Sequence, residues 1–174
     1  MIAATNAVRS DTAELSGPLK PIGPPIMLTG AHGMIIKKTV NDPYWQYRIT
    51  GGQVRIKLMS ADFGHLHDAP AICADHARVQ ETELQELMRD YDILRGLGHE
   101  DPATALSACV NADHVLDYLK RAKQECTYGF YVADAEKSIW GVCVYWVPFD
   151  GWSIRAAPIT HAVPWRDGTI IVTR

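Results

Sequence analysis

The sequence lacks the local motifs that identify many enzyme classes. It contains no G-x-x-x-x-G-K-[ST] or G-x-G-x-x-G pattern, so nothing predicts a phosphate-binding loop. It also contains no G-x-S-x-G pattern of a serine nucleophile. No run approaches the roughly 18 apolar residues of a membrane span. The first residues show no basic start followed by an apolar block, so we expect neither a membrane segment nor a secretion signal.

The chain also has few cysteines and a small net charge. The four cysteines, Cys73, Cys109, Cys126 and Cys143, form no C-x-x-C pair, which favours free thiols in a reducing compartment and hence a cytoplasmic location. A net charge of −3 and an isoelectric point of about 6.1 argue against a nucleic-acid or membrane partner. Nothing in this composition requires a cofactor.

The stretch from Tyr128 to Val147 is the clearest structural signal. Two runs rich in β-branched and aromatic residues flank a polar break at residues 134–137, which predicts a hairpin. In the second run, residues 139–147, apolar side chains occupy both alternating sets of positions. A strand with one face in water would alternate with polar residues, so we expect this strand to be central and covered on both sides.

The rest of the chain predicts an α+β fold of a mostly antiparallel sheet of about six to eight strands, with an antiparallel helix pair packed on one face. The chain order would be strands, two helices, strands. Apolar residues at spacings of three and four predict one helix from Asp68 to Gly96 and a second one from Asp101 to Lys123. We expect residues 1–24, rich in proline and glycine, to form a flexible arm, and residues 25–174 to form a single domain.

Charge is unevenly distributed along the chain. Residues 61–101 carry ten acidic side chains against three arginines, which would give the first helix an acidic face. Such a face can bind a partner, or it can simply be the solvated side of a helix. The leading hypothesis is a small soluble domain that acts through a protein partner rather than as an enzyme, and a homo-oligomer remains open. The residues expected to contact the partner are Glu81, Glu83, Glu86, Asp90, Trp140, Trp146 and Trp152.

Two alternatives remain. Residues 62–76 are rich in histidine and aspartate, and His65 and His67, two apart on an extended segment, would point the same way. With His76 they could bind zinc or another divalent metal, as in a metal-dependent, hydrolase-like enzyme. The second alternative is a small-molecule-binding domain, because an aromatic pocket could be lined by Trp140, Trp146, Trp152, Tyr131 and Tyr145.

Overall fold

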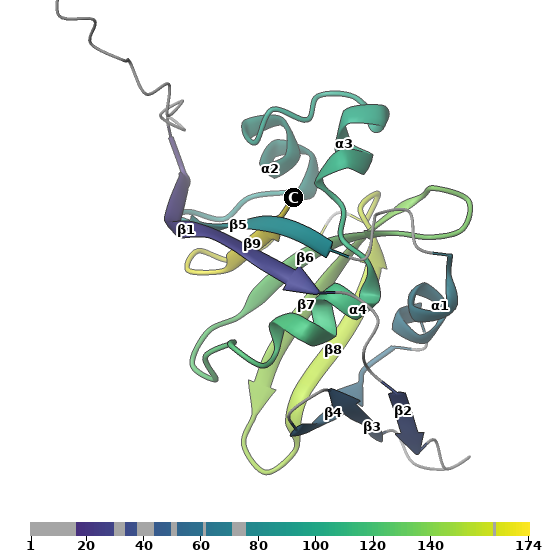
Figure 1. The fold of residues 1–174 in the computed structure, drawn as a ribbon. Helices are drawn as coiled ribbons and strands as arrows, with labels where there is room; N and C mark the ends of the chain where they lie inside the picture. The colour runs from purple at the N-terminus through teal and green to yellow at the C-terminus, as the bar shows by residue number, and fades with distance from the viewer. Residues whose placement is uncertain are drawn as a thin grey trace, which may run out of the picture.

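The computed structural model describes residues 17–29, 34–37, 44–49, 52–60, 62–70, 76–161 and 163–174, with side chains described outside 34–37, 44–49 and 52–55. Within these residues the fold is α+β, with a mixed sheet and four short helices (Figure 1). The elements are β1 (Leu19–Thr29), β2 (Met34–Lys37), β3 (Tyr44–Ile49), β4 (Gly52–Leu58), α1 (Asp62–Asp68), β5 (His76–Leu84), α2 (Asp90–Gly96), α3 (Pro102–Ala108), α4 (Ala112–Tyr118), β6 (Tyr128–Ala133), β7 (Ile139–Val147), β8 (Gly151–Pro158) and β9 (Ile170–Thr173). No helix in the described part of the chain is long and apolar enough to cross a membrane.

The sheet runs in the order β1-β5-β9-β6-β7-β8-β4-β3-β2. Most neighbours are antiparallel, as expected, but β6 pairs with β9 and β4 pairs with β8 in parallel. β6 and β7 form the predicted hairpin at the centre of this order, with Tyr128 opposite Val144 and Ala133 opposite Ile139. β3 and β4 pair antiparallel as well, with Ile49 opposite Gly52.

Both faces of the central strands are covered, which explains the two-sided apolar pattern of residues 139–147. One side of the sheet, which we call the α4 face, is covered by α1 and α4. There Phe130 and Val142 pack in a cluster with residues of these helices, such as Leu66 and Leu116. In Figure 1, α4 lies in front of the central strands. On the other side, here the Trp165 face, Tyr131 packs in a second cluster with residues of α2 and α3.

The predicted helix from Asp68 to Gly96 is wrong, and with it the acidic helix face. Residues 76–84 form strand β5, which pairs with β1 on one side and β9 on the other. Burial alternates with a period of two over the first four residues of β5, since Ala77 and Val79 are buried whereas His76 and Arg78 are exposed. Pairing on both edges satisfies the backbone polar groups of β5, and this outweighs the helix-like spacing of the apolar residues that follow. Helix α2 begins only at Asp90.

The predicted second helix is two helices. It starts where expected, because Asp101 caps α3 by accepting a hydrogen bond from the Thr104 backbone N–H at 2.9 Å. The chain then leaves the helix at residues 109–111, where Val110 bridges to Val132 of β6, and α4 starts after Asn111. The expected single helix pair on one face is therefore replaced by α1 and α4 on one face and α2 and α3 on the other.

The expected arm, residues 1–24, also needs a correction. Strand β1 begins at Leu19 and includes the prolines that were expected to keep this stretch irregular. The register with β5 shifts between Ile22 and Ile26, a stretch that contains Pro24 and Pro25, whereas Pro21 lies in register opposite Thr82. Proline cannot donate to the ladder and is tolerated at such irregularities and on edge strands such as β1. Residues 1–16 lie outside the described residues.

Candidate functional site

A pocket of about 760 Å³ opens on the Trp165 face of the sheet. Its floor includes Cys143 and Tyr145 of β7 and Arg155 of β8, and one wall is the chain from Val163 to Thr169. Side chains that point to this face come from the alternate positions of β7 and β8 that do not face α4. The pocket therefore follows from the strand register.

Trp165 is brought to this face by a backbone bridge. The Met88 N–H donates to the Trp165 carbonyl at 3.0 Å, and the Trp165 N–H donates to the Met88 carbonyl at 2.8 Å. The indole then lies over two glycines of neighbouring strands. A Cβ atom at Gly129 would lie 3.0 Å from the indole ring, and one at Gly141 would lie 3.3 Å from it. Glycine at both positions is what allows the ring to approach the sheet so closely.

Asp90 follows Met88 by two residues and is held against the indole. The Trp165 Nε1–H donates to Asp90 Oδ1 at 2.6 Å, and the Tyr131 hydroxyl donates to the same oxygen at 3.0 Å. No donor in the described part of the chain reaches the second oxygen, Oδ2. Asp90 is 7% exposed and is one of the residues that line the pocket. The carboxyl group is therefore fixed through its Oδ1 atom at the edge of the pocket.

Burial sets the ionisation of several groups here. Desolvation raises the pKa of Asp90 above its usual value, and the hydrogen bonds from Trp165 and Tyr131 only partly offset it. Desolvation likewise raises the pKa of the Cys143 thiol, although the guanidinium of Arg155 acts in the opposite direction. The Cys143 thiol is thus not activated as a nucleophile.

Charge and aromatic surface complete the pocket. Its lining holds three acidic residues, Asp90, Glu125 and Asp167, against Arg155 and Arg166. With histidine neutral, the lining carries one net negative charge. Two aromatic side chains, Trp165 and Tyr145, are also part of it. The lining thus combines a buried acceptor, a small excess of negative charge and aromatic surface.

The acidic residues predicted to bind a partner do not share one surface. Glu81 on β5 accepts a hydrogen bond from the hydroxyl of Tyr118 in α4. Glu83, also on β5, accepts one from the side chain of Gln85 at 2.9 Å. Glu86 is exposed in the following loop, and Asp90 lies in the pocket. The structure therefore brings none of the other three acids to the pocket.

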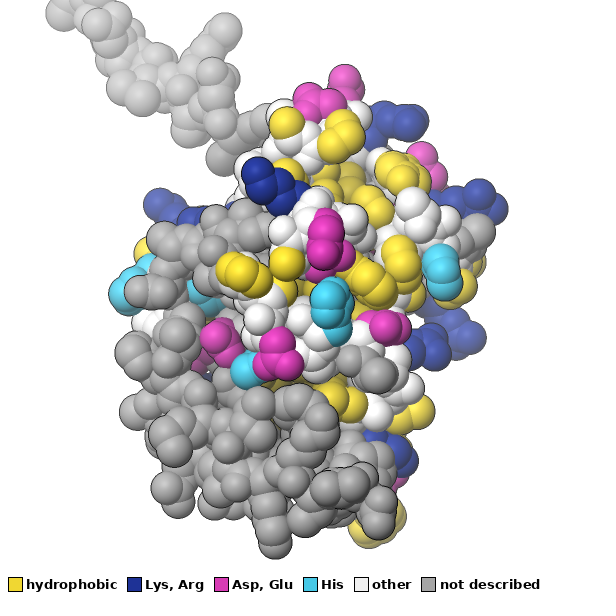
Figure 2. Space-filling view, turned by 90° about the vertical axis from the view of Figure 1, so that its right-hand side faces the viewer, with side chains coloured by type: hydrophobic (Ala, Val, Ile, Leu, Met, Phe, Trp, Pro, Cys, Tyr) yellow, Lys and Arg dark blue, Asp and Glu magenta, His cyan; other side chains and the backbone are white. Residues whose placement is uncertain are grey.

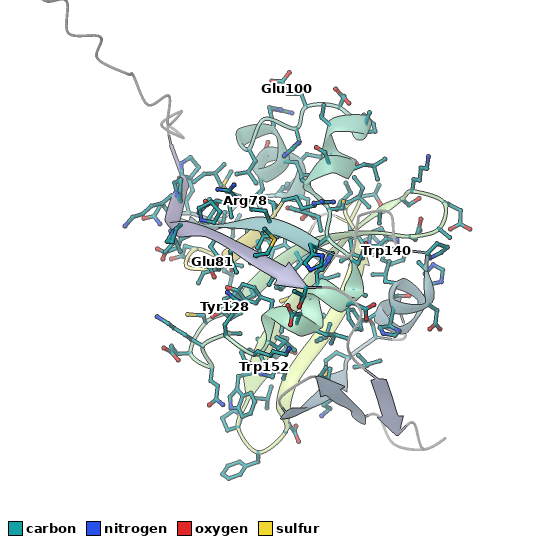
Figure 3. All side chains as sticks on the ribbon, in the orientation of Figure 1. Arg78, Glu81, Glu100, Tyr128, Trp140 and Trp152 are labelled. Atoms are coloured by element: carbon teal, nitrogen blue, oxygen red, sulfur yellow. The ribbon has the colours of Figure 1, made fainter. Side chains whose placement is uncertain are left out.

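The predicted tryptophans share the α4 face but lie at two ends of it, Trp146 and Trp152 paired at one end and Trp140 at the other. Trp152 is buried, and its ring meets that of Trp146 edge to face, with centroids 5.4 Å apart. Trp140 is half-buried and lies beside α1 (Figure 3). The expected aromatic pocket is thus divided between the two faces of the sheet. The three tryptophans pack on the α4 face, whereas Tyr131 and Tyr145 point to the opposite face. Tyr145 lines the pocket, and Tyr131 is buried behind Asp90.

The three predicted metal-binding histidines lie on two different elements. His65 and His67 are in helix α1, where residues two apart point in different directions, so the expected extended geometry is wrong. His67 instead approaches Asp113 of α4, with its Nε2 atom 3.2 Å from the Asp113 carboxylate. His76 is exposed at the start of strand β5. His65 lies near a different set of ligating groups, Asp134 and Glu136.

Sequence reasoning expected Tyr131 at an aromatic pocket but missed Trp165 and Gly141 as its neighbours in the site. A signal for the glycines was present, because a glycine inside an apolar strand often marks a close approach of another group. Nothing in the sequence indicated which group approaches. Comparison of the chain with protein-family models, with curated proteins and with solved structures found no match, so the site is interpreted from its own geometry.

Proposed function

We propose that this protein binds a small organic cation, an ammonium compound with an apolar body, in the pocket of the Trp165 face. One observation carries the proposal: a buried carboxyl group, that of Asp90, lines the pocket and is held there by hydrogen bonds from Trp165 and Tyr131 to its Oδ1 atom. A mostly preformed pocket with a few fixed polar groups is the usual form of a ligand site.

The choice of a carboxyl group at this position supports a functional role. If Asp90 only had to accept hydrogen bonds from Trp165 and Tyr131, an asparagine oxygen would do so without the cost of a buried charge. Because desolvation raises the pKa of Asp90, the charged form destabilises the folded state relative to a neutral acceptor. Perturbed acids of this kind concentrate at functional sites.

The lining favours a cation over an anion. Acidic side chains outnumber basic ones, and the buried carboxylate would be neutralised by an ammonium group that donates to Oδ2. The aromatic faces of Trp165 and Tyr145 can add cation–π contacts, which are worth about 0.5–2 kcal/mol each. The apolar part of such a ligand would be covered by Val163, Pro164 and the floor of the sheet.

Three probes of equal size separate these contributions: benzylamine, benzyl alcohol and benzoate. Binding is measured by isothermal titration with the wild-type protein and with Asp90→Asn, which keeps an acceptor for Trp165 and Tyr131. We expect the amine to bind about tenfold or more tightly than the other two, and Asp90→Asn to remove this preference. Equal binding of the three probes, tighter binding of benzoate, or an unchanged preference in Asp90→Asn contradicts the proposal.

A protein partner at the tip of the β7–β8 hairpin is the second candidate. Phe149 is 98% exposed and adopts a positive φ of 69°, a conformation that costs a non-glycine residue about 1–2 kcal/mol. A large apolar side chain retained at a strained, exposed turn favours a contact role. A partner captured by the wild-type protein should be lost with Phe149→Ala and kept with Met27→Ala, an exposed apolar control on β1. Identical capture by all three proteins contradicts this candidate.

A further inference from the structure

Among the residues that the structure describes, one histidine and two carboxylates converge outside the pocket. The ligating atoms of His65, Asp134 and Glu136 all lie within 4.8 Å of one another. His65 comes from helix α1, whereas Asp134 and Glu136 belong to the turn between β6 and β7. Figure 2 shows histidine and acidic side chains close together on the side of the molecule that carries α1.

The carboxylate of Asp134 is the fixed member of this group. Its Oδ1 atom accepts a hydrogen bond from the Ser138 backbone N–H at 2.8 Å, and its Oδ2 atom accepts one from the Trp140 Nε1–H at 3.0 Å. A carboxylate offers about four acceptor positions, so further positions remain for a cation. Asp134 is 5% exposed, whereas the two other members of the group, His65 and Glu136, are exposed.

The Trp140 indole is the hydrogen-bond donor to Asp134 Oδ2. Trp140 also contacts His65, with ring centroids 6.4 Å apart in an edge arrangement. One tryptophan therefore orients two of the three groups, as outer-shell partners do in metal sites.

We propose that His65, Asp134 and Glu136 bind a zinc ion and thereby join helix α1 to the β6–β7 turn. Three protein ligands, one imidazole and two carboxylates, leave a fourth tetrahedral position for water. Calcium would require six to eight oxygen ligands, which this group does not supply. Tetrahedral zinc with bonds of about 2.0–2.2 Å places its ligand atoms about 3.4 Å apart. The ligand atoms now lie within 4.8 Å of one another, and His65 and Glu136, whose side chains are exposed, can rotate to shorten these separations.

The site is tested by calorimetric titration of untagged protein with zinc chloride. The wild-type protein should bind one ion per chain, and His65→Ala and Glu136→Gln should each weaken binding by about tenfold or more. Matched controls remove the same groups elsewhere: His76→Ala on β5, and Glu100→Gln, which lies at the far end of the molecule beyond α2 and α3 (Figure 3). Both controls should bind zinc as the wild-type protein does.

Each contrary result is decisive because the four substituted side chains lie at the surface or in exposed turns. Absence of zinc binding to the wild-type protein overturns the proposal, as does binding that survives both His65→Ala and Glu136→Gln. Loss of binding in His76→Ala would instead support a site built on the three histidines. Thermal unfolding with and without zinc gives a second readout, because an ion that joins α1 to the turn stabilises the folded state. Zinc should raise the unfolding midpoint of the wild-type protein and of the two controls. It should not raise that of His65→Ala or Glu136→Gln.

Discussion

Replacement of Asp90 separates its hydrogen-bonding role from its charge. Asp90→Ala removes the acceptor for Trp165 and Tyr131, whereas Asp90→Asn keeps an oxygen in the same place and removes only the ionisable group. The Tyr131 side chain is 1% exposed, so its hydroxyl cannot turn to bulk water when its partner is lost. The two substitutions should therefore have very different effects on stability.

The magnitudes follow from the two hydrogen bonds at Asp90 Oδ1. Two lost hydrogen bonds, one of which leaves a buried hydroxyl without a partner, predict a cost of about 2–4 kcal/mol for Asp90→Ala. Asp90→Asn should lie within about 1 kcal/mol of the wild-type protein, because both donors keep an acceptor. Urea unfolding followed by far-ultraviolet circular dichroism measures both values.

The pH dependence of the asparagine variant gives the sign of the charge effect. Desolvation raises the pKa of Asp90 in the folded state, so the folded protein holds this proton more tightly than the unfolded chain does. The contribution of Asp90 to stability therefore falls as pH rises from about 4 through the folded pKa, and this fall is absent in Asp90→Asn.

The stability of Asp90→Asn relative to the wild-type protein should thus increase between about pH 4 and about pH 8. A relative stability that is equal at the two pH values would refute the reasoning about the charge. An Asp90→Asn variant as unstable as Asp90→Ala would refute the assignment of the two hydrogen bonds.

Three further substitutions test the packing, the α1–α4 contact and the hairpin tip. Gly129→Ala should cost about 1–3 kcal/mol of unfolding free energy, because its Cβ would lie 2.7 Å from Ile171 Cδ1; wild-type stability in urea would contradict this. The hydrogen bond to Asp113 raises the pKa of His67, so the charged imidazole stabilises the folded protein at low pH. His67→Ala should therefore lose about 1 kcal/mol of unfolding free energy below pH 6, and this loss should shrink as pH rises towards 9. A loss that does not change with pH would contradict this. Phe149→Gly should raise the free energy of unfolding by about 1 kcal/mol, because glycine adopts a positive φ without strain. A fall in stability, measured in urea, would show that the turn is not strained.

The central hairpin could be predicted from the sequence because its signal is local and redundant. Residues 128–133 and 139–147 have strand-forming side chains, a polar break between them, and no competing helical spacing. The apolar character of both faces of β7 was also informative. It required cover on each side, and the structure supplies it with helices on both faces of the sheet.

The segment from residue 68 to 96 was misread because two periodicities overlap in it. Its apolar residues from Leu84 to Leu94 fit a helical stripe, but they lie across the end of β5, a loop and α2. The alternation at Ala77 and Val79 was short, and the partners that stabilise β5 as a strand, β1 and β9, are distant in the sequence. Tertiary pairing decided the outcome, and spacing alone could not show it.

The site could be predicted only in fragments. Asp90 was expected to meet a partner, but its hydrogen-bond donors are 41 and 75 residues away along the chain. His65 was expected to bind metal, but the groups that approach it, Asp134 and Glu136, lie in the β6–β7 turn, about 70 residues further along the chain. Helix α1 comes near that turn by packing beside β8. Residue type indicated these candidates, whereas their neighbours depend on the fold.

The indole resonance of Trp165 in a proton–nitrogen correlation spectrum tests the ligand site most directly. The Trp165 Nε1–H donates to Asp90 Oδ1, so a cation that binds Oδ2 must change its chemical environment. Titration with benzylamine should shift this resonance in a saturable manner, leave that of Trp146 on the opposite face in place, and have little effect on Trp165 in Asp90→Asn. A Trp165 resonance that stays in place while benzylamine binds elsewhere, or that shifts equally in Asp90→Asn, would contradict the assignment of Asp90 as the anchor of the ligand.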